Sequence, residues 1–462
     1  MVATMNQLPD SIVRHIGCYF SIEDADCLRR INSHWFHSIG SSEYLMERQV
    51  QGVAEEVLCW TNGKYIASKS KGTNKSKNNR NQKLLEELPL GQIHCYIPSL
   101  HQWRVFGATT TNHTDMITMN CTNKISDYCT VWIPSLYTAV FLGGYNMENG
   151  AINVTVWAYS FLTNTLQPWP SLLHSSLPEQ TQGQKEKNHT KYPSPSYTDR
   201  LHATLIGNFT IIVISTDNTV CNQTLDCSTY ATKNSWTRIS PLPQQNLCSV
   251  TCGSGDIISA IVSSTCSRYL YVLQDNNPQY PALLYHLHTD LWTPLLSCTT
   301  YNNKIKPNHQ NDLTVPIQSS ILHLQNQIFF LGGFIYDNNN DSDADTIILD
   351  KILYLQEDGE TVDMTHFVLG EVKECSLPYA IRGSSCCIYD GKLTMLGGLT
   401  GWNVNSLPSN DPWQLIDEYS LNGTSSNGGS LNKQIVSGTW SCLPIRLPFD
   451  VILEGLSFSM MM

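Results

Sequence analysis

Three segments of this 462-residue chain share one pattern, an apolar strand that ends in a double glycine. They read VFLGGY, FFLGGF and TMLGGL, with the glycine pairs at 143–144, 332–333 and 397–398. Two further apolar runs, Ile211–Ile214 and Tyr269–Leu273, occupy the same place without the glycines. Recurrence of this kind is typical of repeat architectures, in which each repeat is one supersecondary unit. The pattern therefore predicts a ring or stack of similar β-units.

An aromatic residue followed by a tryptophan accompanies these strands. The pairs are Tyr96 and Trp103, Tyr159 and Trp169, Tyr230 and Trp236, Tyr285 and Trp292, and Tyr419 and Trp440, and one further unit has Tyr354 and Phe367. Six units predict six four-stranded blades of a β-propeller, a ring that protects its strand edges. The double glycine would end the second strand in a positive-φ bend, and the tryptophan would lie on the outer strand and pack between blades. Seven blades is the alternative count.

The first unit shows only its outer strands before Trp103. The tail, Leu453–Met462, is predicted to supply an inner strand for it, so that the two ends of the chain close the ring. Composition agrees with a mainly β protein. Charged residues make up only 15% of the chain, below the usual quarter, and the many Tyr, Trp and Thr residues favour strands.

Residues 8–45 read as compact helices. Leu8-Pro9-Asp10 is a helix-start signal, because proline suits the first turn and an acid complements the helix dipole. Apolar residues at spacings of three and four follow: Ile12, Ile16, Phe20, Leu28, Ile31 and Trp35. A block of about 40 residues is marginal as an independent fold, so it needs a partner or an abutting domain. A helical cap packed on the rest of the chain is the plain alternative.

The segment LPDSIVRHIGCYFSIEDADCLRRINSHWFHSIGSSEYL resembles an F-box along its whole length. The family's opening Leu-Pro, its helix aliphatics and its tryptophan all have counterparts, whereas Ala25 stands where leucine is common. The resemblance implies an F-box at residues 4–50 that binds the Skp adaptor and, through it, the cullin of an SCF ubiquitin ligase. It implies this role for Leu8, Pro9, Ile12, Ile16, Phe20, Leu28, Ile31 and Trp35.

The repeats resemble the kelch family over residues 85–462. The segment RLHATL, beginning at residue 200, is similar to the family's first-strand entry. Two units lack the double glycine and one lacks the tryptophan, which leaves the blade count and register open. The resemblance implies a kelch-type β-propeller preceded by the small all-α F-box.

Residues 51–84 are expected to form a helix and a basic flexible linker. The stretch KYIASKSKGTNKSKNNRNQK at 64–83 has too few apolar residues to bury a core, and a nuclear-import signal is its alternative role. The net charge is nevertheless −11, so the body of the chain is acidic. An acidic body argues against a nucleic-acid groove, which needs a basic face.

No motif for catalysis or for a cofactor occurs. The sequence has no GxSxG, no HExxH and no P-loop, and its 16 cysteines form no CxxC pair. We therefore expect a non-enzymatic protein without metal or cofactor. The apolar runs are too short to span a membrane and the N-terminus lacks a leader pattern, which favours the cytoplasm, the nucleus or both.

The sequence favours an adaptor, with the helical hook on a ligase and the propeller on a protein to be ubiquitinated. A kelch scaffold without a ligase role is the main alternative, and a propeller oxidase would need convergent axial ligands that the sequence does not display. Long loops that follow the glycine strands are expected to recognise the target. Their aromatic candidates are Tyr145, Tyr336, Trp402 and Trp413, and their aspartates favour a target with a basic segment.

Overall fold

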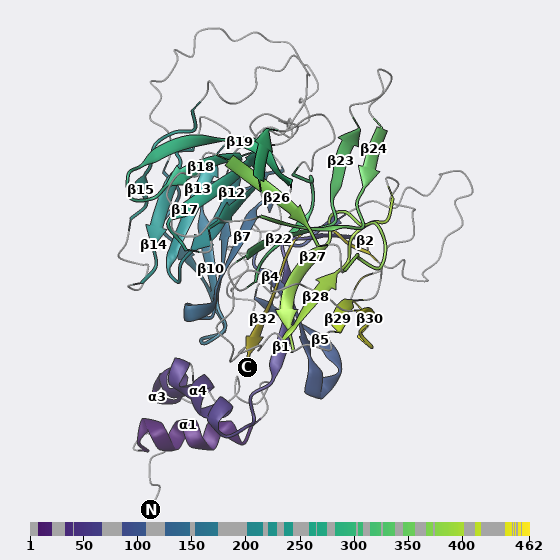
Figure 1. Cartoon of the computed structure of the whole chain (residues 1–462). Coiled ribbons are helices and arrows are strands. Elements are labelled where there is room, and N and C mark those ends of the chain that lie inside the picture. The colour runs from purple at the N-terminus through teal and green to yellow at the C-terminus, as the bar shows by residue number, and fades with distance from the viewer. Residues whose placement is uncertain are drawn as a thin grey trace, which may run out of the picture.

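The structure is a computed structural model. It describes residues 8–20, 33–39, 41–66, 86–107, 125–147, 153–173, 201–215, 220–228, 235–243, 258–264, 266–274, 282–301, 304–307, 315–324, 327–337, 345–355, 366–372, 375–401, 412–416, 439–445, 447, 449, 451–453 and 455–462. Within these ranges the chain forms a six-blade β-propeller with a small group of helices beneath it (Figure 1). The expected mainly β fold and the count of six blades are confirmed.

Each blade is a four-stranded antiparallel sheet. Blade 1 contains β32 (Leu456–Met461), β1 (Glu56–Thr61), β4 (Gln92–Ile97) and β5 (Gln102–Gly107). Blade 2 contains β7 (Cys129–Ile133), β8 (Thr138–Leu142), β10 (Val156–Ser160) and β11 (Thr165–Trp169). Blade 3 contains β12 (Leu201–Ile206), β13 (Thr210–Ser215), β14 (Gln223–Asp226) and β15 (Thr237–Arg238).

The remaining blades repeat this order. Blade 4 contains β16 (Ile258–Ser263), β17 (Tyr269–Gln274), β18 (Ala282–His286) and β19 (Leu291–Tyr301). Blade 5 contains β21 (Ser320–Leu324), β22 (Gln327–Leu331), β25 (Ile352–Leu355) and β26 (His366–Glu371). Blade 6 contains β27 (Ser385–Tyr389), β28 (Lys392–Leu396), β29 (Trp413–Ile416) and β30 (Thr439–Cys442). The long β19 also pairs with β20 (Lys304–Pro307) and, in parallel, with β26, which joins blades 4 and 5.

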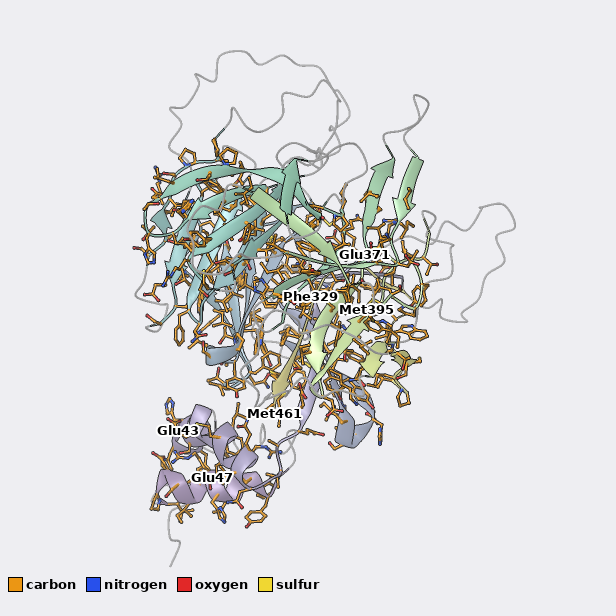
Figure 2. All side chains as sticks on the ribbon, in the orientation of Figure 1. Glu43, Glu47, Phe329, Glu371, Met395 and Met461 are labelled. Carbon is orange, nitrogen blue, oxygen red and sulfur yellow. The ribbon has the colours of Figure 1, made fainter. Side chains whose placement is uncertain are left out.

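The first strand of each blade is the inner one. First strands of neighbouring blades contact one another: β32 touches β27 and β7, β12 touches β7 and β16, and β21 touches β27. Each of the six blade-to-blade interfaces has its own buried apolar cluster. Phe329 and Met395, both labelled in Figure 2, belong to the cluster between blades 5 and 6. The core is therefore a ring of interfaces, as expected of a radial repeat.

The two ends of the chain close the ring, as the sequence predicted. The tail strand β32 pairs with β1 over six residues, from Leu456 opposite Thr61 to Met461 opposite Glu56. The Ser459 hydroxyl donates to the Ile388 carbonyl of blade 6 at 2.7 Å. The Phe458 ring stacks on Trp132 of blade 2, with centroids 4.3 Å apart. The last strand of the chain thus contacts blades 1, 2 and 6 together.

The double glycines bend the chain as predicted, and the reason is close contact with the next blade. Gly143 and Gly332 have φ values of +69° and +63°, a region that glycine adopts without steric cost. A Cβ at Gly332 would lie 2.3 Å from the Ile381 carbonyl oxygen in the approach to blade 6. A Cβ at Gly143 would lie 2.2 Å from the side chain of Leu201 in blade 3. The glycine pair therefore lets the second strand of one blade end against its neighbour.

The tryptophans lie on or directly before the outer strands, as expected. Trp103 and Trp292 are paired across the strands with Tyr96 and Tyr285, as the repeat pattern implied. The indoles also connect the blades. The Trp236 indole donates to the Pro170 carbonyl of the preceding blade at 2.7 Å, and Trp292 donates to the Ser240 carbonyl at 3.2 Å. In blade 2 the register differs, because Tyr159 is opposite Leu166 and Trp169 is opposite Val156. In blade 5, Tyr354 is opposite Gly370 rather than Phe367. Tyr230 and Tyr419 lie outside the described residues.

The propeller begins earlier than the sequence indicated. We expected it to start at residue 85, with 51–84 as helix and linker, yet β1 already belongs to blade 1 and β2 (Lys64–Ile66) follows it. Residues 57–61 of β1 are buried. The strand ends at Thr61, and the next residue, Asn62, has a φ of +53° and takes the place of a double glycine. The basic stretch from 67 to 83 lies outside the described residues.

Short β-ribbons extend one face of the ring, where second strands end and first strands begin; we call this the glycine face. The ribbons are β2, β3 (Glu86–Glu87) and β31 (Val451–Leu453), β6 (Ile125–Ser126) with β9 (Tyr145–Asn146), and β23 (Phe334–Asp337) with β24 (Asp345–Ile348). The opposite face carries the turns between first and second strands, and we call it the turn face. The described α-helices, α1 (Asp10–Cys18), α3 (Ser33–Ile39) and α4 (Ser42–Val50), lie at the turn face (Figure 1).

Candidate functional site

The helices α1, α3 and α4, which we call the helical unit, have a core of their own. Val13, Trp35, Ile39 and Tyr44 are buried together in it. Gly17 permits the close approach of α1 to α4, since a Cβ there would lie 2.9 Å from the Tyr44 ring. The Tyr44 hydroxyl donates to the Gly17 carbonyl at 3.1 Å. The apolar spacing in the sequence thus produces a packed helical unit.

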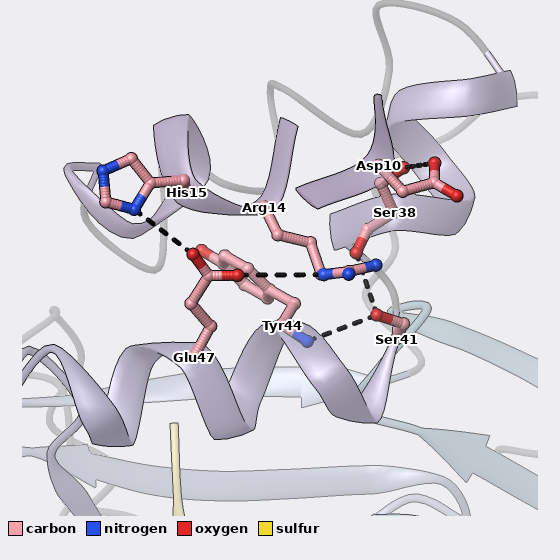
Figure 3. A network of polar contacts seen from close by, with 7 residues as sticks. All are labelled: Asp10, Arg14, His15, Ser38, Ser41, Tyr44 and Glu47. Carbon is pink, nitrogen blue, oxygen red and sulfur yellow. Dashed lines mark hydrogen bonds and ion pairs between the residues drawn. The ribbon is translucent and has the colours of Figure 1, made fainter. Parts of the chain in front are cut away.

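Polar contacts hold the helices in register (Figure 3). The Ser38 hydroxyl donates to the Asp10 carboxylate at 2.6 Å, and this bond lowers the pKa of Asp10. Glu47 of α4 lies 3.2 Å from the ring of His15 and 3.8 Å from Arg14, both on α1. These contacts are partly exposed, so each adds little to stability. They connect α1 with α3 and α4.

Arg48 joins the helical unit to the propeller. Its buried guanidinium donates to the Phe20 carbonyl beyond α1 and to the Val53 carbonyl ahead of β1, both at 3.0 Å. Two residues on, the Glu55 backbone exchanges hydrogen bonds with Met462, and its carboxylate accepts from the Ser99 hydroxyl at 2.7 Å. The connection between helices and blade 1 is therefore a chain of hydrogen bonds.

The helical unit also packs on blade 2. Tyr137, in the turn before β8, and Leu162, in the turn after β10, lie against its core. Both turns belong to the turn face, so none of the described α-helices lies on the glycine face. The described parts of the chain therefore present two separate surfaces, the outer side of the helical unit and the glycine face.

The residues predicted to bind the Skp adaptor have different environments. Ile12 and Phe20 are 45% and 39% exposed and Pro9 is exposed, whereas Leu8 and Ile16 are half-buried. Trp35 is only 2% exposed, so it supports the surface from inside the core. Leu28 and Ile31 lie outside the described residues.

Sequence reasoning missed three exposed apolar side chains of the helical unit. Tyr19 lies one turn beyond Ile16 and is 75% exposed. Met46 and Val50 are one turn apart on α4 and are also exposed. Met46 and Val50 are four residues apart, so they lie on one face of α4, away from the buried Tyr44 and Leu45. This spacing could have identified the pair from the sequence. Exposed apolar side chains gathered on a small unit indicate a protein interaction site.

The predicted target-binding aromatics are placed only in part. Tyr145 is half-buried in β9, opposite Ser126. Trp413 is half-buried in β29, edge-on to the Tyr379 ring at 5.7 Å. The backbone of Tyr336 lies in β23 opposite Thr346. Trp402 and the side chain of Tyr336 lie outside the description. Tyr145 and Tyr336 follow second strands, so the loops that carry them open onto the glycine face as expected.

A pocket of about 330 Å³ opens on the glycine face near the axis. Its walls include Asn62–Lys64 after β1, Asp127 and Tyr128 before β7, Gly455 before β32, and Leu201 and His202 at the start of β12. Blades 1, 2 and 3 therefore all contribute to the pocket. Lys64 Nζ lies 3.5 Å from the Asp127 carboxylate and 3.9 Å from the Glu87 carboxylate. The Asp127 backbone N–H donates to Glu87 at 3.1 Å. One cation thus faces two anions in this pocket, which we call the axial pocket.

Asn62, Tyr128 and His202 also line the axial pocket. The Tyr128 hydroxyl donates to the Leu88 carbonyl at 3.0 Å, and burial raises the pKa of this phenol. The Tyr128 hydroxyl is therefore a fixed, neutral hydrogen-bond donor to the backbone. Across the described ranges, no group of three or more His, Cys, Asp or Glu side chains is arranged to hold a metal ion.

No protein-family model matches the chain, and no curated protein matches it in sequence. In the part of the chain that is described, no helix is long and apolar enough to cross a membrane.

Proposed function

We propose that this protein is a substrate-recognition adaptor of an SCF-type ubiquitin ligase, built as an F-box followed by a kelch-type propeller. The helical unit binds the Skp adaptor, and through it a cullin. The propeller binds the protein to be ubiquitinated. The adaptor itself performs no chemistry and works in the cytoplasm, the nucleus or both.

The observation that carries the proposal is the exposed apolar surface of the helical unit. Ile12, Tyr19 and Phe20 are exposed along α1 and just beyond it, whereas Val13, Trp35, Ile39 and Tyr44 are buried in the core of the unit. Apolar side chains that a small helical unit leaves in water gain free energy when a partner covers them, at about 25 cal/mol per Å². The Leu-Pro start, the helical spacing and the buried tryptophan of the resembled family fit a partner that itself presents helices.

The propeller supports the second half of the proposal. A six-blade ring with ribbons on one face is a rigid scaffold, and rigid scaffolds commonly carry binding loops. The helical unit lies on the turn face, so a protein bound at the glycine face would not compete with the ligase for space. Fold alone does not define a target, so the target class must come from the chemistry of that face.

Co-purification with the Skp adaptor tests the proposal. The full chain should retain a co-expressed Skp adaptor, and Ile12→Asp should abolish retention. Ile12 lies in the first turn of α1, where an acid suits the helix dipole, so this variant should remain folded. A hot spot of about 2 kcal/mol corresponds to a roughly 30-fold loss of affinity.

Leu291→Asp is the matched control, because Leu291 is an equally apolar and 61% exposed side chain of blade 4. Retention lost with Ile12→Asp but kept with Leu291→Asp would support the adaptor role. If the wild-type protein retains no Skp adaptor, the chain is instead a propeller scaffold without a ligase role.

A further inference from the structure

Two cysteines of blade 1 lie side by side in neighbouring strands. Cys59 of β1 is directly opposite Cys95 of β4, and their sulfur atoms are 3.2 Å apart. Opposed residues of an antiparallel pair have Cα atoms about 4.5 or 5.5 Å apart, and disulfides span Cα distances of roughly 4.4–6.8 Å. The backbone therefore already has the spacing of a disulfide. The two sulfurs need to approach by only about 1 Å to reach the S–S bond length of about 2.05 Å.

Cys386 and Cys387 in blade 6 provide a comparison within the same chain. They are adjacent in β27, and successive residues of a strand point to opposite faces of the sheet. Cys386 accordingly lies in the apolar cluster between blades 5 and 6, and Cys387 lies in the cluster between blades 6 and 1. These two thiols cannot join while β27 stays a strand. The closeness of Cys59 and Cys95 is thus a product of the register between β1 and β4.

The environment of the pair decides when it can react. Cys59 and Cys95 are both 0% exposed, in the cluster between blades 1 and 2 that also contains Phe458 of β32. Burial raises the pKa of the Cys59 thiol, so this thiol reacts with an oxidant only slowly while the interface is closed. Because β32 closes the ring and contributes to the cluster, its detachment opens a path to the two sulfurs.

We propose that Cys59 and Cys95 are a reversible redox switch that crosslinks blade 1 in the presence of hydrogen peroxide. One thiolate attacks a peroxide oxygen, the O–O bond breaks, and a sulfenic acid forms as hydroxide leaves. The second thiolate attacks the sulfenic sulfur, the S–O bond breaks, and the disulfide forms as a second hydroxide leaves. The two thiol protons convert both hydroxides to water. Two thiols are oxidised, and one peroxide is reduced to two molecules of water.

The crosslink ties β1 to β4 independently of β32. The segment before β1 connects the helical unit to the propeller through Arg48 and Val53, so the helical unit stays attached to blade 1 even while the ring is open. Disulfides in reducing compartments are usually transient, so the dithiol is the resting state in the cytoplasm or nucleus proposed above. The switch depends neither on the ligase role nor on the identity of the target.

Peptide mapping of the full chain tests the inference without any variant. The folded chain is treated with hydrogen peroxide, capped with N-ethylmaleimide in denaturant and digested with trypsin. Cys59 and Cys95 are the single cysteines of the tryptic peptides 49–64 and 84–104. These peptides should be recovered as one linked species, lighter than their sum by two hydrogen atoms, and dithiothreitol should separate them. The peptide 383–392 is the internal control, because Cys386 and Cys387 should both carry caps.

Thermal unfolding measures the effect of the crosslink. Oxidation should raise the melting temperature of the wild-type chain by roughly 4–8 °C, as expected for a disulfide that closes a loop of this length in a large domain. Cys95→Ala should show no such rise. Its oxidised and reduced samples are compared with each other, so any stability that the substitution itself removes cancels. Phe458→Ala should form the link several-fold faster than the wild type, because it loosens the closure.

Separate caps on Cys59 and Cys95 after peroxide treatment of the wild-type chain would overturn the inference. A link from either cysteine to Cys387 or to any other cysteine would also overturn it. Equal melting temperatures of the linked and the reduced wild-type chain would show that the bond does not hold blade 1. Equal rates of linkage in the wild type and Phe458→Ala would reject detachment of β32 as the path of the oxidant.

Discussion

Replacing Phe458 with alanine should destabilise the whole propeller. Phe458 is 5% exposed in β32, and its ring stacks on Trp132 of blade 2. Removing a buried phenylalanine side chain typically costs about 3–5 kcal/mol, from lost burial and from the cavity that remains. Because β32 supplies the inner strand of blade 1, the lost stability measures how much this strand contributes to closing the ring.

The expected fall in melting temperature is roughly 6–10 °C, at about 2 °C per kcal/mol for a large domain. Thermal unfolding followed by circular dichroism measures it. Met461→Ala is the control, because Met461 lies three residues further along β32 and is only half-buried, so it should shift the transition much less. Deletion of residues 456–462 should abolish the cooperative transition, because it also exposes the edge of β1. Equal melting temperatures for Phe458→Ala and Met461→Ala would refute closure by the tail.

Further predictions concern a glycine, a histidine and an arginine. Gly332→Ala should lower the free energy of unfolding by about 3 kcal/mol or more, because the added Cβ would collide with a backbone carbonyl. Gly391 also has a positive φ, of +66°, but no atom lies within 4 Å of its Cβ position, so Gly391→Ala should cost only about 1 kcal/mol. Urea titration compares the two variants. Burial lowers the pKa of His94 from 6.5 to about 4, so unfolding takes up a proton between pH 6.5 and pH 4. The free energy of unfolding should therefore fall by about 3 kcal/mol as the pH drops through this range. Urea titrations at each pH measure this loss, and His94→Phe should remove it. Arg48→Met should speed proteinase K cleavage between α4 and β1, since it removes the bonds that connect them, and an unchanged cleavage rate would show that Arg48 does not hold this connection.

The local features of the propeller were predictable from the sequence. The glycine pairs marked where second strands end, because only glycine fits against the next blade. The tryptophans marked outer strands, because a large ring with one donor suits an interface between blades. The glycine pairs and the tryptophans are both required by contacts with the neighbouring blade. They therefore recur in the sequence from blade to blade.

The start of the ring was not predictable from the same signals. The run EVLCWT at β1 lacks the double glycine, and Asn62 makes the equivalent bend with a positive φ. Its neighbours in the sheet, β4 and β32, lie far apart in sequence, at Gln92–Ile97 and Leu456–Met461. The parallel pairing of β19 with β26 is likewise a long-range contact without a motif.

The axial pocket was missed for a similar reason. Lys64 lies in the segment that the sequence assigned to a linker, and Glu87 and Asp127 belong to none of the patterns that marked the repeats. Only ring closure brings the end of β1 beside the approach to β7. The exposed side chains of the helical unit were half predicted: the α1 stripe followed from spacing, but Trp35 proved to be core.

The central claim is that the helical unit binds the Skp adaptor. Size-exclusion chromatography with light scattering, on a mixture of the purified full chain and purified Skp adaptor, tests it most directly. The account predicts one peak with the summed mass of one copy of each protein, and two separate peaks when Ile12→Asp replaces the wild-type chain. Separate elution of the wild-type chain and the Skp adaptor, with both proteins folded, would contradict it.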